Sequence, residues 1–407
     1  MTSNMTQAIL LAVFVMLLSA GSVLAQIAVR GQTVHTMAGP AIKDGVVLIK
    51  DGKIERVGPA SQVQIPQGYK TITAAVVTPG LIDARSVVGL AGYLNQPHDQ
   101  DQIERSASVQ PELRGIDAYN ALEELVEHLR SYGITTLHTG HAPGALVSGQ
   151  TIIVKTRGDN VEQAVVVPSA MIAVTLGNTG LAQGRAPGTR AKAVAMLRAE
   201  LIKAREYATK RDSASEDKRP TRDLRLEALA QVIKKETPLL VNTHRAHDIL
   251  SALRIAKEFD IRIVLEGASE AYLVMDQIKA AGVPVIVHPS MQRAGGEAEN
   301  LSMETAANLR KAGVQLALQS GYESYVPKTR VVLFEAAIAA ANGLTFEQAL
   351  GLITIDAARL LGIGNRVGSL EAGKDGDVVL FDGDPFEYSS HVLGVIIDGQ
   401  IVSEARK

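Results

Sequence analysis

Short apolar runs alternate with longer amphipathic segments between Val77 and Leu361. Runs such as Pro238–Asn242 and Val283–Val287 have the length of buried strands, and the segments between them carry apolar residues at helical spacing. Strands that alternate with helices favour a parallel sheet covered by helices. We therefore predict an α/β fold, a (β/α)8 barrel that occupies residues 77–362.

Both ends of the chain carry a different pattern, with short β-type runs around tight turns. Gly45–Lys50 leads into Asp51-Gly52, a strong hairpin signal, and a similar turn stands at Asp398-Gly399. We predict that residues 26–76 and 363–407 combine into one small β-sandwich domain beside the barrel.

The first residues have the layout of an export signal. Ala8–Leu18 is an unbroken apolar run, and small residues follow it up to Ala25. Such a segment is too short to span a bilayer comfortably and predicts a signal peptide over residues 1–25. Met1–Gln7 contains no Lys or Arg, which leaves an uncleaved membrane anchor as the alternative. The signal leads us to expect a periplasmic or secreted protein, and a chain without Cys, and therefore without disulfides, fits a bacterial periplasm.

Charge and aromatic content exclude one class of partner. The chain has 41 basic and 43 acidic residues, and its formal net charge of −2 argues against a general nucleic-acid-binding surface. Aromatic residues make up only 4% of the chain and include no Trp, so platforms that stack on bases are scarce. We expect a small-molecule or peptide-like ligand and no nucleic acid.

Thr78–Val87 has the pattern of a strand that runs out into a loop after Asp83. Because side chains alternate along a strand, Arg85 and Val87 are expected to point the same way. The run resembles the first barrel strand of the amidohydrolase superfamily, Pro-Gly-Leu-Ile-Asp-x-His-x-His, whose two histidines bind the catalytic metal. Arg85 and Val87 stand at those two histidine positions.

Other stretches carry the same resemblance. The loop His138–Gly144, followed by Ser148-Gly149-Gln150, is similar to a loop of the branch related to imidazolonepropionase and metal-dependent prolidases. Gly368–Val379 resembles the return of that family's chain into its β domain. The resemblance covers essentially everything after residue 25. It implies metal-dependent hydrolysis of C–N bonds in small amides, peptides or cyclic imides.

The resemblance also implies ligands for zinc or another divalent metal. They are two His on the first strand, often a carboxylated Lys on the fourth, one His each on the fifth and sixth, and an Asp on the eighth. The fourth-strand stretch, Ala170–Gly177, contains no Lys, and the sixth and eighth positions hold Gly267 and Gly321. The fifth position keeps His244. Because the first-strand pair cannot bind a metal either, we predict a degenerate metal site and no bound cofactor.

The polar residues near the predicted strand ends could still form a site. Arg85 could bind a ligand carboxylate, or it pairs with a nearby acid. The segment after the eighth strand, with Tyr322, Glu323, Lys328 and Arg330, could line a polar pocket or belong to a lid or subunit contact. The polar, irregular stretch over residues 93–114 is expected to form a loop over the mouth. The histidines, with His247 and His288 among them, form a relocated metal site or are satisfied by hydrogen bonds within the fold. The candidate ligand-binding residues are Arg85, His138, His141, Asn242, His244, Tyr322 and Lys328.

Three hypotheses about function follow. The first is an exported amidohydrolase-like pseudoenzyme, non-catalytic or weakly active, that binds a peptide-like ligand or docks onto an active amidohydrolase paralogue. The alternative is an active hydrolase of C–N bonds with a relocated metal site or a metal-free mechanism. The third is a carboxylate-binding module centred on Arg85. In each case we expect an oligomer.

Overall fold

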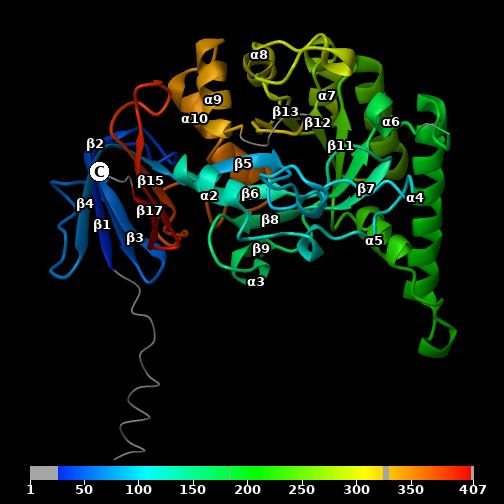
Figure 1. Cartoon of the computed structure of the whole chain (residues 1–407), viewed down its shortest axis with the longest axis horizontal. Helices are drawn as coiled ribbons and strands as arrows, with labels where there is room; N and C mark the ends of the chain where they lie inside the picture. The colour runs from blue at the N-terminus through cyan, green and yellow to red at the C-terminus, as the bar shows by residue number, and fades with distance from the viewer. Residues whose placement is uncertain (1–25, 183, 324–329, 405–407) are drawn as a thin grey trace, which may run out of the picture.

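The computed structural model of the chain describes residues 26–182, 184–323 and 330–404. The predicted signal peptide and Lys328 lie outside the described residues. A β domain and a larger body of strands and helices lie side by side (Figure 1). Within the described ranges, no helix is long and apolar enough to cross a membrane.

The β domain is one sheet of seven strands in the order β17-β16-β15-β4-β1-β2-β3. The first part of the chain supplies β1 (Ile27–Val34), β2 (Ile42–Lys50), β3 (Lys53–Pro59) and β4 (Lys70–Pro79). The last part supplies β15 (Val378–Phe381), β16 (Val392–Ile397) and β17 (Gln400–Glu404). β15 pairs antiparallel with β4, so strands from distant parts of the sequence are hydrogen-bonded neighbours.

The strands of this domain form one continuous sheet, whereas a β-sandwich was expected to have two. Inward side chains from both halves of the sheet share one core, which includes Ile27, Val47 and Ile396. The sheet thus encloses its own hydrophobic side chains, a task that two layers perform in a sandwich. The expected hairpin at Asp51-Gly52 joins β2 to β3. Both turn residues have positive φ, 52° and 78°, as a type I′ turn requires.

The larger body contains parallel strands connected by helices. β5 (Leu81–Ser86) pairs parallel with β6 (Ile134–Thr139), and a second sheet has parallel strands that follow one another in chain order. The strands of the second sheet are β10 (Ile172–Thr175), β11 (Leu239–Thr243), β12 (Ile263–Gly267), β13 (Val285–Val287) and β14 (Leu316–Ala317). The predicted α/β class is therefore confirmed.

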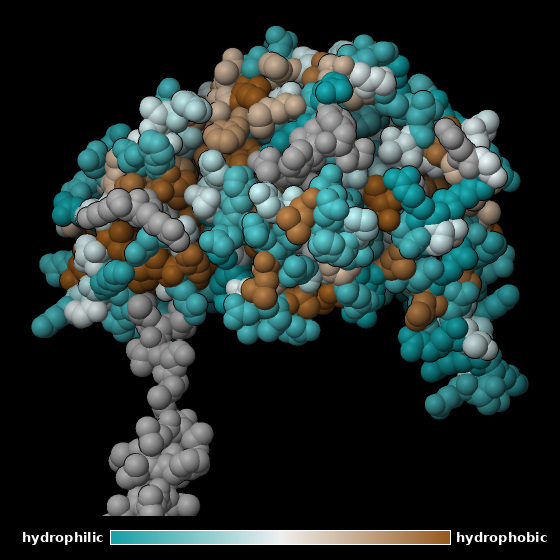
Figure 2. Space-filling view, in the orientation of Figure 1, coloured by the Kyte–Doolittle hydropathy of each residue, from teal (hydrophilic) through white to brown (hydrophobic). Residues whose placement is uncertain are grey.

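Helices connect these strands and cover them on the outside (Figure 1). Their bounds are α2 (Glu124–Ser131), α3 (Val161–Ala164), α4 (Arg190–Ser213), α5 (Leu224–Ile233), α6 (Ala246–Phe259), α7 (Met275–Ala281), α8 (Thr305–Ala312), α9 (Val332–Ala341), α10 (Phe346–Leu352) and α11 (Ile355–Leu360). One end of α4 extends beyond the body, and its surface there is mostly hydrophilic (Figure 2). Such a charged end is stable in water without a covering partner.

β7 (Val147–Gln150) and β8 (Ile152–Lys155) interrupt the parallel order. β7 pairs antiparallel with β10, β8 pairs antiparallel with β6, and β9 (Val165–Val167) adds to β8. The strands of the body therefore belong to two sheets, and their pairing does not confirm a closed barrel of eight parallel strands. Two backbone hydrogen bonds of 3.2 Å, from Ala84 to Leu318 and from Gly321 to Arg85, join β5 to the chain after β14.

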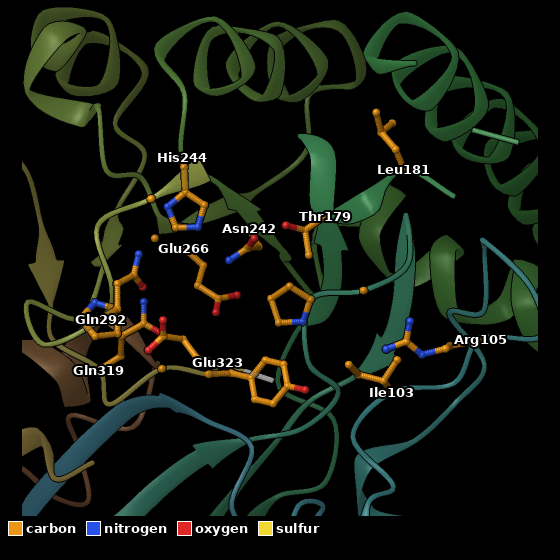
Figure 3. A pocket seen from close by; sticks show the side chains of 17 residues that line it. Ile103, Arg105, Thr179, Leu181, Asn242, His244, Glu266, Gln292, Gln319 and Glu323 are labelled. Atoms are coloured by element: carbon orange, nitrogen blue, oxygen red, sulfur yellow. The ribbon is translucent and has the colours of Figure 1, made fainter. Parts of the chain in front are cut away.

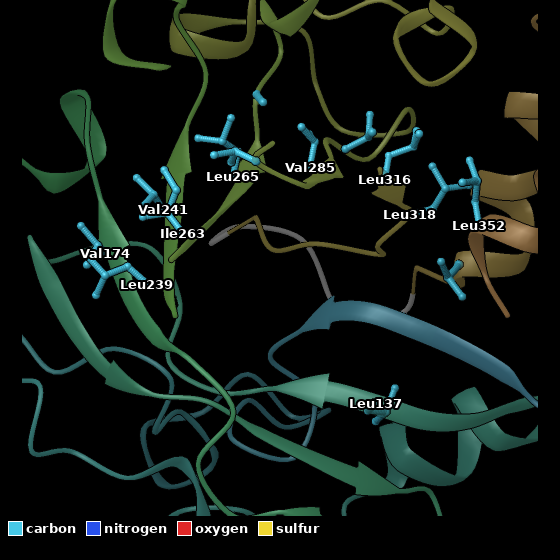
Figure 4. Packing of buried hydrophobic residues seen from close by; sticks show 14 of the residues in the cluster. Leu137, Val174, Leu239, Val241, Ile263, Leu265, Val285, Leu316, Leu318 and Leu352 are labelled. Atoms are coloured by element: carbon cyan, nitrogen blue, oxygen red, sulfur yellow. The ribbon is translucent and has the colours of Figure 1, made fainter. Parts of the chain in front are cut away.

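Alternate residues of the parallel strands pack on two faces. Leu239, Val241 and Leu265 belong to the large cluster that also includes the covering helices (Figure 4). Their sequence neighbours Leu240 and Val264 belong to a second cluster, together with side chains of β5, β8, β13 and β14. Strands that are buried on both faces have nearly continuous apolar sequences, which is why they could be recognised before the structure.

A buried ion cluster joins the body to the β domain. Lys155, at the end of β8, has a side chain that is only 3% exposed. Its Nζ lies 3.1 Å from Oδ2 of Asp375 and 3.4 Å from Oδ1 of Asp398, and it donates a hydrogen bond to Asp377. All three carboxylates come from the C-terminal part of the chain, so these charge pairs fix the two parts against each other.

Candidate functional site

A cavity of about 560 Å³ opens at the carboxyl ends of β11 and β12, beside the chain that follows β14. Ligands of α/β folds bind at this edge of the sheet, and the volume suits a small molecule. Figure 3 shows the carboxylate of Glu266 pointing into the cavity, with His244 and Asn242 beside it. Of the positions singled out from the sequence, the cavity is lined by Asn242, His244, Gly267, Gly321 and Tyr322.

Arg85 lies behind the cavity and not among its lining residues, and it is 1% exposed. Its Nη1 donates to the carbonyl of Ser86 at 2.7 Å, and its Nη2 donates to the carbonyl of His141. Its Nε lies 3.4 Å from Oε1 of Glu266. Because both terminal nitrogens already serve backbone carbonyls, the structure does not place Arg85 to bind a ligand carboxylate. Of the two roles expected for Arg85, the structure shows the ion pair, and its partner is Glu266.

Glu266 is the buried acid at the floor of the cavity. Burial raises the pKa of its carboxyl group above the ordinary value, although the guanidinium of Arg85 and a hydrogen bond from Asn242 act against this rise. The ion pair with Arg85 favours the charged carboxylate. A carboxylate has about four lone-pair sites, so Glu266 can accept further hydrogen bonds from a ligand.

His244 has a fixed orientation at the cavity wall. Its Nδ1 lies 2.8 Å from Oγ of Ser269, and burial lowers the pKa of the imidazole to about 4, so the ring is neutral near pH 7. The ring lies against Gly267, whose φ is +83°. A Cβ atom at Gly267 would lie 2.8 Å from Cε1 of His244, so the backbone conformation and the space both favour glycine here.

Gly321 is a second glycine of positive φ in the lining of the cavity. Its φ is +70°, and a Cβ atom there would lie 2.4 Å from Cγ of Pro289. A side chain at this position therefore requires the surrounding chain to move. Gln319, two residues earlier, also lines the cavity and is 2% exposed. Its Nε2 donates to the carbonyls of Val287 and Ile286, at 3.0 and 3.4 Å.

The other predicted histidines lie away from the cavity lining. Nδ1 and Nε2 of His138 lie 2.7 Å from the carbonyl of Ala84 and from Oγ1 of Thr151, and burial lowers its pKa to about 3. His141 is buried, its pKa is lowered to about 4 by burial and by Arg85, and neither ring nitrogen has a partner among the described residues. His247 is exposed, whereas the ring nitrogens of His288 form hydrogen bonds with the carbonyl of Pro289 and with Oγ1 of Thr305.

Two further residues of the first strand are buried around the site. Asp83 accepts hydrogen bonds from the backbone N–H and the hydroxyl of Ser320, and burial raises its pKa to about 6. Val87 packs in a small apolar cluster with Ala91, Ala142 and the ring of Tyr322. Neither is directed at the cavity as a metal ligand of this fold would be, and Val87 has no lone pair at all.

The divalent metal implied by the resemblance does not fit the residues present. A guanidinium, a valine and two glycines stand at four of the matching positions, and His244 alone offers a lone pair. Across the described part of the chain, no group of three or more His, Cys, Asp or Glu side chains is placed to hold a metal ion.

Two further segments contribute to the cavity lining. Glu323 belongs to the polar segment after the eighth strand, which was expected to line a pocket, and Ile103 and Arg105 belong to the loop expected over the mouth. Which side chains of that loop reach the cavity depends on how the loop folds. Gln319 was not singled out from the sequence, although it lies two residues before Gly321.

Sequence comparison places these observations among known proteins. The profile of the Amidohydrolase family matches residues 76–402. An imidazolonepropionase from Sphingopyxis alaskensis is 25% identical over 398 residues, which cover 86% of this chain and 91% of that protein. The amidohydrolase tasK from Hapsidospora irregularis is 24% identical over 393 residues, although the chain spans only 39% of its length.

Solved structures that resemble this chain also include amidohydrolases and prolidases. The crystal structure of an amidohydrolase from Thermotoga maritima matches with a TM-score of 0.88 and 31% identity, over 93% of this chain and 100% of that one. A prolidase complexed with n-methylphosphonate-L-proline matches with a TM-score of 0.60 and 16% identity, over 94% of this chain and 100% of that one. At that identity, the prolidase likeness concerns the fold alone.

Proposed function

The chain belongs to the amidohydrolase family, and from that membership we propose that it binds a small amide-like or peptide-like ligand in its strand-end cavity without metal-dependent hydrolysis. The observation that carries this proposal is the buried ion pair between Arg85 and Glu266 at the cavity floor. A permanent cation already neutralises the acid at the place where the family binds its metal.

Electrostatics support this proposal. The Arg85 guanidinium repels a divalent ion and offsets most of the attraction that the adjacent Glu266 carboxylate would exert on that ion. Steric crowding at Gly267 and Gly321 also supports the proposal, because a metal-binding residue at either position would have no room for its Cβ atom. Restoring the family's metal site would therefore take several backbone and side-chain changes together.

We also infer that the strands of the body follow the family's eight-stranded barrel. Side chains from several strands of both sheets, among them Ile82, Ile153, Leu240 and Ile286, meet in one inner cluster. In a (β/α)8 barrel the interior is filled by layers of this kind. The backbone bonds between β5 and the chain after β14 support closure at that side. A solved structure in which that inner layer opens to solvent would contradict this inference.

Elemental analysis tests the proposed function directly. We expect protein purified from zinc-replete cells to contain much less than one divalent metal ion per chain after exhaustive dialysis. Ligand binding should persist in the presence of a chelator. A stoichiometric metal together with chelator-sensitive hydrolysis of dipeptides or cyclic amides would overturn the proposal.

A metal-free hydrolase is the second candidate function. It is favoured by one observation, the neutral His244 held by Ser269 at the cavity wall near the buried acid Glu266. An imidazole in that position can accept a proton from an attacking water. A substrate screen of dipeptides and cyclic amides with chelator present tests it. Turnover that His244→Ala abolishes would favour the hydrolase, and no turnover would favour the binding protein.

We further propose that the protein is exported after cleavage near Ala25 and works in an assembly with an active amidohydrolase paralogue or with itself. The apolar Ala8–Leu18 run motivates the first part, and the altered site in a preserved fold motivates the second. Mass spectrometry of the mature N-terminus and co-purification at native expression level test them. An intact N-terminus in the cytosolic fraction would contradict export, and a monomer without partners would contradict assembly.

A further inference from the structure

We propose that the floor of this cavity selects its ligand by hydrogen-bond donors, with Gln319 as a specificity-determining acceptor. In the family, the metal at this floor takes up an acceptor, the oxygen of a carbonyl group. In this chain an N–H group of an amide or an ammonium would bind there. The inference rests on the proposed function, because it concerns the ligand of the same cavity.

The orientation of the Gln319 side chain is fixed by its own hydrogen bonds. Nε2 donates to the carbonyls of Val287 and Ile286 on β13. The reverse orientation would set the amide oxygen against two carbonyl oxygens, so the chemistry decides which atom is left over. Oε1 is buried and has no hydrogen-bond partner among the described residues. Gln319 can therefore offer the ligand an acceptor but not a donor.

Gly321 lies beside this acceptor. A Cβ atom on Gly321 would lie 3.7 Å from Oε1 of Gln319, and both residues line the cavity. Because Gly321 carries no side chain, none of its own atoms occupies this position between Pro289 and Oε1. An Asp at that position, as the family's pattern has it, would fill the same space.

Glu266 supplies the second acceptor of the floor. Its carboxylate points into the cavity (Figure 3), and Nε of Arg85 lies 3.4 Å from its Oε1. Because Arg85 balances its charge, the carboxylate can accept from a neutral amide as well as from an ammonium. Gln319 does not titrate, so the demand for a donor does not depend on the ionisation of Glu266.

Three probes that share one skeleton test this inference. They are 4-carbamoylbutanoate, 5-aminopentanoate and monomethyl glutarate, which end in a primary amide, an ammonium and a methyl ester. The ester has no N–H donor. Titration of the full-length chain by ligand-observed NMR, with chelator present, should show the amide or the ammonium binding at least about tenfold more tightly than the ester. A tighter amide points to a neutral donor, and a tighter ammonium points to the charge of Glu266.

Variants assign the selectivity to one residue. Gln319→Met should remove most of the preference over the ester, whereas Gln292→Met, the same exchange at another lining residue, should retain it. Gln319→Glu should favour the ammonium over the amide, and this gain stays measurable even if Gln319→Met proves unstable by thermal melting. Binding of the ester as tight as that of both the amide and the ammonium would overturn the inference and leave the proposed function standing. Failure of all three probes to bind would overturn both.

Discussion

Nε of Arg85 lies 3.4 Å from Oε1 of Glu266, and the two side chains are 2% and 5% exposed. Truncation of the cation would leave an uncompensated buried carboxylate. We therefore expect Arg85→Ala to lower the free energy of unfolding by about 3–5 kcal/mol. Urea denaturation measures this loss. The matched control is Arg30→Ala, which breaks a solvent-exposed pair with Asp44 and should change stability little.

The double variant Arg85→Met with Glu266→Met separates charge from packing. Replacing both members of a buried ion pair by apolar side chains is often close to neutral in stability. We expect the double variant to recover most of the loss seen in Arg85→Ala. If it remains as unstable as the single variant, the backbone hydrogen bonds that Arg85 donates to Ser86 and His141 matter more than its charge.

Gly321 should tolerate substitution less well than a glycine of similar φ in open space. Gly321→Ala combines a strained φ of +70° with a contact of 2.4 Å to Pro289, and we expect a loss of about 2–4 kcal/mol. Gly282 has a φ of +64° and nothing within 4 Å of its Cβ position, so Gly282→Ala should cost only about 1 kcal/mol. Chemical denaturation compares the two. Equal losses would show that the contact with Pro289 relaxes easily.

Glu335 on α9 should make stability depend on pH. Burial raises the pKa of its carboxyl group to about 7, against backbone hydrogen bonds from Ser290 and Met291 that lower it. The folded state then binds a proton that the unfolded state releases at lower pH. Stability should therefore fall by roughly 3 kcal/mol as pH rises from about 4.5 to 7.

Glu335→Gln isolates this contribution. The variant cannot ionise, so its stability relative to the native chain should rise over the same pH interval and be nearly constant outside it. Urea denaturation at several pH values gives the difference. A difference that does not vary with pH would contradict the role of Glu335.

Lys155 should be required for the junction between the body and the β domain. Lys155→Met removes the ammonium shared by Asp375, Asp377 and Asp398, and we expect a loss of about 3–5 kcal/mol. Lys53 also pairs with Asp375 but is 53% exposed, so Lys53→Met should cost less than about 1 kcal/mol. Calorimetry would show whether the two parts then unfold in separate transitions. A single unchanged transition would contradict this role.

Local patterns predicted much of the fold because they depend on few residues. The Asp51-Gly52 hairpin needs only two residues that accept positive φ, and buried strands such as β11 need only a short apolar run. The antiparallel β7 and β8 were not predicted, because their direction depends on partners far away in the sequence. The single sheet of the β domain was not predicted for the same reason, because the pairing of β4 with β15 joins strands far apart in the sequence.

The candidate site was predictable in its positions but not in its contacts. Asn242, His244 and Tyr322 do line the cavity, since strand ends converge at one edge of a sheet. Arg85 was expected to face either a ligand or an acid. The sequence could not distinguish the two, because the partner of Arg85, Glu266, lies on a strand far away in the sequence. The free acceptor of Gln319 depends on carbonyls of another strand, which no local pattern reveals.

The pairing of β4 with β15 gives the chain an order of assembly. During synthesis β4 emerges roughly 300 residues before its antiparallel neighbour, so one edge of the β domain has no partner until nearly the whole chain is available. During synthesis the sheet of the β domain therefore cannot be completed before β15 has emerged, and a chain shortened before β15 would expose an unpaired strand edge that favours aggregation.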